Sequence, residues 1–161
     1  GYLPIGGVAI SKRVADVVIS GGEFAHGYTY SGHPVSAAVA KANIEIIERE
    51  GMVEAVRDET GPYLQAKLAE LADHPLVGQV RGMGMVGALE LVQDKVTRTP
   101  FDKDVEIAGQ VRDIAIATGL MVRAVGDCLI MSPPLCITKA EIDELITLLT
   151  AALDKVQAQV Q

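Results

Sequence analysis

Residues 120–131, Leu-Met-Val-Arg-Ala-Val-Gly-Asp-Cys-Leu-Ile-Met, decide the fold of the second half of the chain. Two mostly apolar runs flank Gly126-Asp127, and a two-residue turn containing glycine between such runs is typical of a β-hairpin. Pro133-Pro134 follows closely and ends the second run, because proline has no N–H group to give to a sheet. We therefore expect two antiparallel strands here.

Two further strands are expected before this hairpin. Residues 77–80 and 85–92 are apolar enough to form them, and Arg81-Gly82-Met83-Gly84 connects the two. Repeated glycine in such a connection indicates close backbone approach or a bulge. Together with the hairpin, these runs give the second half of the chain four strands.

Helical spacing of apolar residues recurs in three stretches around these strands, 53–71, 105–115 and 142–153. Gly61-Pro62 lies inside the first, where proline removes a backbone donor, so we expect a kink or a break. Gly119 is the expected cap of the second, and Thr138-Lys139-Ala140-Glu141 before the third matches a capping box. The order α-β-β-α-β-β-α predicts an independent α+β domain over residues 51–161.

The first fifty residues have a different pattern. Val8-Ala9-Ile10 and Val17-Val18-Ile19 are short apolar runs that we interpret as strands. Residues 20–33 are rich in glycine, hydroxyl groups and aromatic rings, and loops of this length usually carry function. Pro34 suits the first position of the helix that follows, and Gly51 suits the position just past its end. Because the chain begins directly on an apolar stretch, we expect residues 1–50 to be an α/β segment at the end of a larger domain.

Composition excludes several classes of function. The chain has 161 residues, of which 49% are hydrophobic and 4% aromatic, and its formal net charge is -7. Without a basic stripe or a supply of exposed aromatic rings, nucleic acid and anionic membranes are poor partners. No apolar run reaches the ~18–20 residues of a membrane span. Cys128 and Cys136 suit neither a disulfide framework nor a zinc site, so we expect two buried, reduced thiols in a cytoplasmic protein.

The candidate functional segment is His26-Gly27-Tyr28-Thr29-Tyr30-Ser31-Gly32-His33-Pro34. Backbone N–H groups and hydroxyls near a helix N-terminus form a natural anion site, for which a phosphate is the obvious ligand. An ordinary polar loop that caps a helix has the same composition, so the residues alone leave both interpretations open. For His26 and His33 we expect hydrogen bonds that shape the loop rather than acid–base catalysis, because no nucleophile is placed beside either.

This segment, together with the stretch from Gly1 to Val8, closely resembles the class III (omega) aminotransferases that use pyridoxal phosphate. Residues 119–127 and Ser132-Pro133-Pro134-Leu135 resemble the C-terminal domain of the same family, and residues 81–85 and 91–95 fall where the family has similar stretches. The resemblance covers essentially the whole chain, in the family's order. It implies a fold type I enzyme, with residues 1–50 at the end of its cofactor-binding large domain and residues 51–161 as its C-terminal small domain.

The resemblance also implies roles for individual residues. Thr29, with the backbone of Tyr28 beside it, would bind the cofactor phosphate of the neighbouring subunit, so that this loop completes the partner's site in a homodimer. Arg123 would pair with the substrate carboxylate, since a planar guanidinium can hold a carboxylate through two parallel hydrogen bonds. Judged by its residue type alone, Arg123 would be a solvated side chain near a hairpin end. No metal site is expected.

The family's Schiff-base lysine is expected upstream of residue 1, so we assign no catalytic residue in this chain, and Lys12 does not take that role. The intact protein would transfer an amino group from an amine or omega-amino acid to a keto acid such as pyruvate, and this chain alone would be inactive. Two alternatives stay open. One is another pyridoxal-phosphate reaction on the same scaffold, such as that of an aminomutase or decarboxylase. The other is a non-catalytic module for dimerisation or ligand binding.

Overall fold

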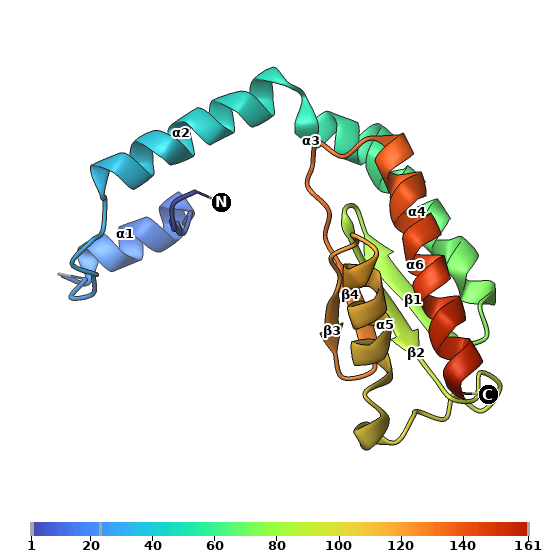
Figure 1. Cartoon of the computed structure of the whole chain (residues 1–161). Coiled ribbons are helices and arrows are strands. Elements are labelled where there is room, and N and C mark those ends of the chain that lie inside the picture. Colours follow the sequence, from blue (N-terminus) through green and yellow to red (C-terminus); the bar gives the residue numbers. More distant parts are fainter. Residues whose placement is uncertain (1, 23, 161) are drawn as a thin grey trace. The chain divides into compact units, whose positions relative to one another are not determined.

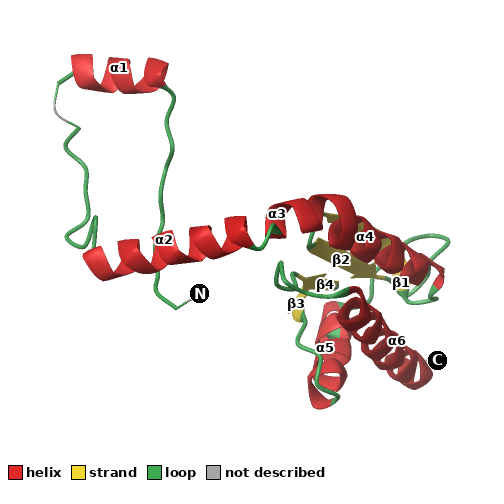
Figure 2. Ribbon diagram, turned by 90° about the horizontal axis from the view of Figure 1, so that it is seen from above, coloured by secondary structure: helices red, strands yellow, loops and turns green. Residues whose placement is uncertain are grey.

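The computed structural model describes residues 2–22 and 24–160, which form two compact units (Figure 1). Unit 1 ends at Glu50, and unit 2 begins at Gly51. Unit 1 consists of α1 (Lys12–Ser20), α2 (Pro34–Arg49) and the loops before and between them (Figure 2). Unit 2 contains a four-stranded antiparallel sheet and the remaining helices.

Helix α1 occupies a stretch in which the sequence predicts a strand. Val17-Val18-Ile19 lies in the second half of α1, so the strand prediction is wrong. Ser11 caps the helix by accepting a hydrogen bond from the Val14 N–H group at 3.4 Å, and Lys12 pairs with Asp16 one turn later at 2.7 Å. A short apolar run cannot distinguish a strand from a helix, and these polar neighbours favour the helix.

The described residues of unit 1 form helices and loops, without the strands expected of an α/β segment. Residues 8–10 form no strand, because no described segment of unit 1 is a strand that could complete their backbone hydrogen bonds. The helix predicted after the loop is present: α2 begins at Pro34, and Gly51 follows its end with a φ of 60°. No described residue of unit 1 is buried, so these residues form no hydrophobic core of their own.

The sheet of unit 2 has the strand order β1-β2-β4-β3. Its strands are β1 (Val77–Met83), β2 (Val86–Leu91), β3 (Arg123–Val125) and β4 (Cys128–Met131). The hairpin predicted around Gly126-Asp127 is confirmed, although β3 is shorter than the apolar run that predicted it. The connection between β1 and β2 is tighter than predicted, because β1 continues to Met83 and only Gly84 and Met85 form the turn. Gly84 has a φ of 55°, which favours glycine.

The first helix of unit 2 is continuous, but its hydrogen-bond pattern changes in the middle. Helix α3 (Met52–Ala55), a π-helical segment (Val56–Thr60) and α4 (Gly61–Glu70) follow one another directly. The Gly61 N–H group donates to the Val56 carbonyl five residues earlier, and a Cβ atom at position 61 would collide with that oxygen. Pro62 has no N–H group, so it donates no hydrogen bond within this turn of the helix. The kink or break expected at Gly61-Pro62 is therefore a π-helical turn just before it.

Helices α5 (Ile107–Ala117) and α6 (Lys139–Val160) complete the unit, with short 3₁₀ turns at Leu71–Asp73 and Lys103–Val105. The predicted capping box at the start of α6 is confirmed. The Thr138 N–H group donates to Glu141 Oε2 at 2.8 Å, and the Glu141 N–H group donates to Thr138 Oγ1 at 3.3 Å. The Glu141 carboxylate accepts hydrogen bonds from the Thr138 N–H group and from the Thr138 hydroxyl, and these two bonds lower the pKa of Glu141 by stabilising its carboxylate.

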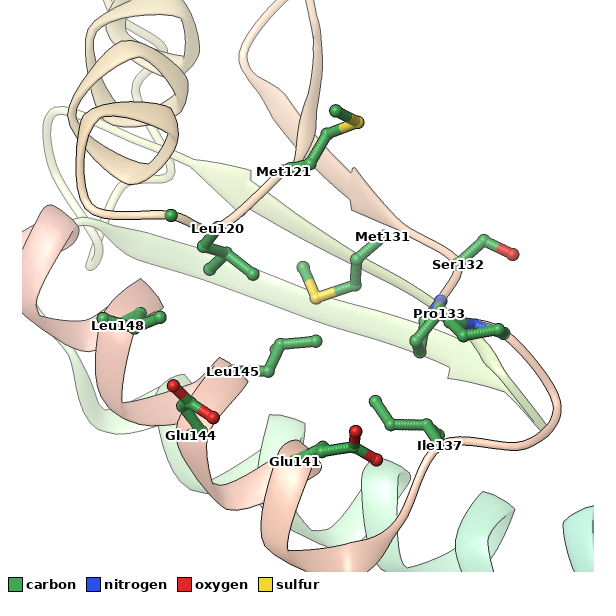
Figure 3. Close-up of a pocket in the computed structure, with 12 residues that line it drawn as sticks. Leu120, Met121, Met131, Ser132, Pro133, Ile137, Glu141, Glu144, Leu145 and Leu148 are labelled. Atoms are coloured by element: carbon green, nitrogen blue, oxygen red, sulfur yellow. The ribbon is translucent and has the colours of Figure 1, made fainter.

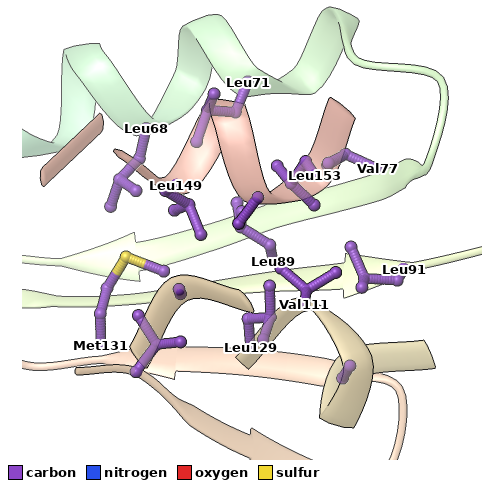
Figure 4. Packing of buried hydrophobic residues seen from close by; sticks show 14 of the residues in the cluster. Leu68, Leu71, Val77, Leu89, Leu91, Val111, Leu129, Met131, Leu149 and Leu153 are labelled. Atoms are coloured by element: carbon purple, nitrogen blue, oxygen red, sulfur yellow. The ribbon is translucent and has the colours of Figure 1, made fainter. Parts of the chain in front are cut away.

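The core lies between the helices and one face of the sheet (Figure 4). Helix α6 packs against both α4 and α5, while α4 also contacts β1 and α5 contacts β3 and β4. Leu89, Leu129 and Met131 point from the sheet into this layer and are at most 4% exposed. Gly87 shares their face, and a Cβ atom there would collide with Leu68 of α4. Unit 2 thus has a closely packed core.

Candidate functional site

The predicted functional segment forms two consecutive turns directly before α2. The Ser31 N–H group donates to the Tyr28 carbonyl at 2.9 Å, and the His33 N–H group donates to the Tyr30 carbonyl at 3.2 Å. Gly32 lies within these turns with a φ of 68°, a backbone conformation that favours glycine. The backbone conformation of the turn therefore explains why glycine occupies position 32.

The two histidines of the segment stabilise the loop in different ways. His33 Nδ1 accepts a hydrogen bond from the Ser36 N–H group at 3.4 Å and so caps α2, which confirms the loop-shaping hydrogen bond expected of it. The His26 ring instead lies edge-on to the Tyr28 ring, with centroids 5.3 Å apart. Because His33 already satisfies a free N–H group and Pro34 has none, the N-terminus of α2 keeps fewer donors for an anion than the sequence suggests.

Thr29 keeps two donors that are not engaged within the loop. Its backbone N–H group and its hydroxyl make no hydrogen bond with any described residue, and the residue is exposed. The Tyr28 N–H group, by contrast, donates to Ser31 Oγ at 3.2 Å within the loop. An anion at this turn can therefore accept hydrogen bonds from the Thr29 donors directly, but from the Tyr28 amide only after Ser31 has released it. This donor set fits a phosphate group.

A cavity of about 870 Å³ opens beside the turns, within unit 1. Its lining consists of side chains and backbone from the loop, the start of α2 and the N-terminal segment: Pro4, Ile5, Gly6, Tyr28, Tyr30, Ser31, Gly32, His33, Ser36 and Ala37. Cavities of roughly 300–1,000 Å³ hold small molecules and cofactors. Thr29 lies between Tyr28 and Tyr30, which both line this cavity, but Thr29 itself is not part of the lining.

Arg123 lies on the face of the sheet that the helices leave uncovered. It is opposite Ile130 of β4, Ile130 is opposite Ala88 of β2, and Ala88 is opposite Arg81 of β1. Directly opposed residues share a face, so these four side chains form one row across the sheet, with an arginine at each end. Arg123 is exposed, and its side chain makes no hydrogen bond or ion pair with a described residue. It is thus available to an incoming carboxylate.

Arg81, at the other end of the row, is already engaged. Its guanidinium lies 3.4 Å from Glu90 Oε2 and 3.6 Å from Cys128 Sγ. Cys128 is half-buried and Cys136 is exposed, and both are free thiols. The expectation of two buried cysteines is therefore wrong, because β4 places Cys128 on the uncovered face and Cys136 follows Pro133-Pro134 in an exposed turn.

A pocket of about 360 Å³ surrounds Arg123 at the edge strand β3. A second arginine lines it, Arg112 of α5, because α5 packs against β3. The other residues of the lining are Met121, Val122, Ala124, Ile130, Met131 and Ser132. Nothing in the sequence connects Arg112 with Arg123, since the contact depends on how α5 packs. The alternation along β3 is the only local signal that places Arg123 on the outer face.

A neighbouring cavity of about 460 Å³ has a different character (Figure 3). Leu120, Met131 and Leu145 form its buried apolar floor, and Glu141 and Glu144 of α6 lie at its edge. Because the Glu141 carboxylate caps α6, it is held in place by Thr138. This cavity therefore offers apolar surface and negative charge, which do not suit a carboxylate.

Two further observations concern metals and membranes. The described residues contain no group of three or more histidine, cysteine, aspartate or glutamate side chains that could hold a metal ion. Across residues 2–22 and 24–160, no helix combines the length and the apolar character needed to cross a bilayer.

The comparisons with known proteins agree with the fold and the motifs. Residues 1–153 match the family model described as aminotransferase class-III, so the chain belongs to the class III aminotransferase family. It is 54% identical over 161 residues to the putrescine–pyruvate aminotransferase of Pseudomonas aeruginosa, covering 99% of this chain and 35% of that protein. It is 43% identical over 162 residues to the diaminobutyrate–2-oxoglutarate transaminase of Halomonas elongata, covering 96% of this chain and 34% of that protein.

Solved structures show the same relationship. An (S)-enantioselective omega-transaminase from Thermomicrobium roseum superposes with a TM-score of 0.91 at 39% identity, over 97% of this chain and 35% of that one. The PMP-bound aminotransferase from Vibrio fluvialis superposes with a TM-score of 0.84 at 38% identity, over 94% of this chain and 33% of that one. The chain thus spans about a third of the length of the curated relatives that it matches.

Proposed function

We propose that the chain is the C-terminal part of a pyridoxal-phosphate-dependent aminotransferase that moves an amino group from an amine or omega-amino acid to a keto acid such as pyruvate. Class III aminotransferases use this cofactor, and a solved relative holds its PMP form. When bound, the cofactor supplies the electron sink for the chemistry at the amine carbon. The observation that carries the proposal is the pair of unengaged donor groups, Thr29 in unit 1 and Arg123 in unit 2, each at the position of a family motif.

Thr29 has the task of holding the cofactor phosphate. Its N–H group and hydroxyl can both donate to phosphate oxygens, and the turn from Tyr28 to Ser31 fixes the backbone that carries them. In the proposed homodimer this phosphate belongs to the neighbouring subunit's cofactor, so that each loop completes the partner's site. None of the residues that the structure describes in unit 1 is buried, which supports such an arrangement, because its apolar side chains need cover from other polypeptide.

Arg123 has the task of binding and orienting the keto acid. A guanidinium with no described partner can form two parallel hydrogen bonds to a carboxylate. The half-buried Ile130 beside it limits access of water to that contact and so strengthens it. When the bound substrate is an amine without a carboxylate, the side chain is free to turn away from it.

In this proposal the lysine that moves the proton lies outside these 161 residues. The proposal also places the protein in the cytoplasm. We infer that the 161-residue polypeptide alone does not transaminate, since neither Lys12 nor any other lysine here follows the family motif. The relatives are named for different keto acids, pyruvate in the Pseudomonas aeruginosa protein and 2-oxoglutarate in the Halomonas elongata protein.

Product analysis of the full-length protein tests this function. Incubation with pyridoxal phosphate, putrescine or an omega-amino acid, and pyruvate should give alanine in step with loss of the amine. An isomerised amino acid or a decarboxylated product without alanine would instead indicate the aminomutase or decarboxylase alternative. No product of any kind, with both donor classes tried, would favour a non-catalytic module.

A further inference from the structure

The pocket around Arg123 is built for negative charge. Two guanidinium groups line it, those of Arg112 and Arg123, and no carboxylate of a described residue does. In a chain with a formal net charge of -7, this composition is a local exception. Two neighbouring cavities differ from this pocket because carboxylates line them. Glu141 and Glu144 line one of them, and Glu106 and Asp127 line the other together with basic side chains.

Both arginines keep donors for a ligand. The Arg123 side chain makes no hydrogen bond with a described residue. Arg112 donates from Nε to Asp113 Oδ1 at 2.8 Å, and its Nη2 lies 2.7 Å from the same oxygen. Its second terminal nitrogen, Nη1, is left free by this pairing. The hydroxyl of Ser132 adds a further neutral donor to the lining.

Apolar side chains make up the rest of the lining. Met131 is 4% exposed, Ile130 is half-buried, and Met121 stands exposed at the margin. The short carbon chain of a small ligand can lie on such a surface while charged groups at its two ends reach the guanidinium groups. The volume of about 360 Å³ suits a molecule of a few carbon atoms rather than a nucleotide or a peptide.

We propose that this pocket binds a short-chain dicarboxylate, with Arg123 holding one carboxylate and Arg112 the other. Arg112 then determines specificity, because a dicarboxylic keto acid uses both arginines and a monocarboxylic one uses Arg123 alone. The proposal rests on the proposed function, in which Arg123 binds the carboxylate of the amino acceptor. It adds a residue and a class of acceptor to that function.

A comparison of two acceptors in the full-length holoenzyme tests the proposal. Arg112→Gln should lower kcat/KM for 2-oxoglutarate by about tenfold or more, mainly through KM, because one charge-assisted contact is lost. The value for pyruvate should stay within about twofold. Arg112→Lys, which keeps the charge but not the fork, should recover part of the loss.

The matched control is Arg57→Gln. Arg57 pairs with the adjacent Asp58 through the same two nitrogens that Arg112 uses toward Asp113, Nε at 2.8 Å and Nη2 at 2.7 Å, although it contacts both carboxylate oxygens. It is exposed on the π-helical segment and lines none of the pockets described above. Its loss should leave both acceptors unchanged. Equal losses in the two variants, or equal losses for the two acceptors in Arg112→Gln, would overturn the proposal.

Direct binding separates this proposal from the proposed function. Glutarate, a dicarboxylate that cannot accept an amino group, should bind the full-length protein in calorimetry, and Arg112→Gln should weaken this binding by about tenfold. Propionate should not distinguish the two proteins. If the protein transaminates pyruvate but binds glutarate equally with and without Arg112, the dicarboxylate site is refuted and the function stands. If glutarate binding depends on Arg112 but neither keto acid is aminated, the function fails and the site stands.

Discussion

The hydroxyl of Tyr63 donates a hydrogen bond of 2.7 Å to the carboxylate of Asp143 and so joins α4 to α6. Lys67 lies 3.4 Å from the same carboxylate, and the amino groups of Lys67 and Lys139 lie 5.6 and 5.7 Å from the centre of the Tyr63 ring. The hydrogen bond from Tyr63 lowers the pKa of Asp143, and the bond to Asp143 raises the pKa of Tyr63. This polar contact connects two helices that otherwise meet through the core.

The contact gives a pH dependence with a defined sign. A lowered pKa of Asp143 stabilises the fold above the ordinary value of 3.8, and this is lost as the pH falls through the lowered pKa. A raised pKa of Tyr63 stabilises it below the ordinary value of 10.0, and this is lost as the pH rises through the raised pKa. The difference in unfolding free energy between the wild-type chain and Tyr63→Phe, measured in urea, should be constant from about pH 5 to 9 and shrink at both extremes. A difference in unfolding free energy that does not change with pH would contradict the role assigned to the Tyr63–Asp143 hydrogen bond.

Gly61 should be intolerant of any side chain. A Cβ atom there would collide with the Val56 carbonyl, so Gly61→Ala should destabilise unit 2 by about 1–3 kcal/mol. Gly109→Ala is the matched control, since it also lies inside a helix but its Cβ would meet nothing closer than 3.6 Å. That change should stabilise by about 0.5–1 kcal/mol, because alanine loses less backbone entropy than glycine. Urea unfolding of both variants provides the comparison, and equal effects would refute the π-helical explanation.

The two units should differ in hydrogen exchange when the 161-residue chain is studied alone. Backbone amides of β2 and β4 lie beside Leu89 and Leu129, which are fully buried, and should exchange only on global unfolding. Amides of α2 should exchange much faster, since no described residue of unit 1 is buried and an isolated helix of this length is marginal in water. Similar protection in the two units would show that unit 1 is stabilised by contacts other than a core.

Local signals in the sequence predicted the parts of the fold that depend on neighbouring residues. The turn at Gly126-Asp127 and the capping box at Thr138 and Glu141 are both present, because each involves residues within a few positions of one another. The strand predicted at Val17-Val18-Ile19 was wrong because an apolar run of three has no periodicity. Ser11 and the Lys12–Asp16 spacing were the signals that indicated a helix.

The site was predictable only in part for the same reason. Thr29 and Arg123 belong to contiguous motifs, and the resemblance to a family assigns them roles. The row from Arg81 to Arg123 depends on the pairing of four strands far apart in the sequence. Arg112 reaches the pocket because α5 packs against β3, which no local pattern specifies.

Thr29 should control cofactor retention. In the full-length protein, Thr29→Ala removes one hydroxyl donor to the phosphate and should weaken pyridoxal phosphate binding by about tenfold, measured by cofactor absorbance after dialysis at graded concentrations. Thr29→Ser keeps the hydroxyl and should bind nearly as well as the wild type. If alanine and serine at this position behave alike, the hydroxyl does not contact the phosphate.

The two half-reactions of the full-length enzyme, followed separately in Arg123→Gln, test the central claim most directly. If Arg123 binds the acceptor carboxylate, kcat/KM for pyruvate with the aminated enzyme should fall about 10- to 100-fold. The half-reaction with putrescine, which has no carboxylate, should change by less than about twofold. Equal losses in both half-reactions, or no loss with pyruvate, would contradict the assignment of Arg123 as the carboxylate-binding residue.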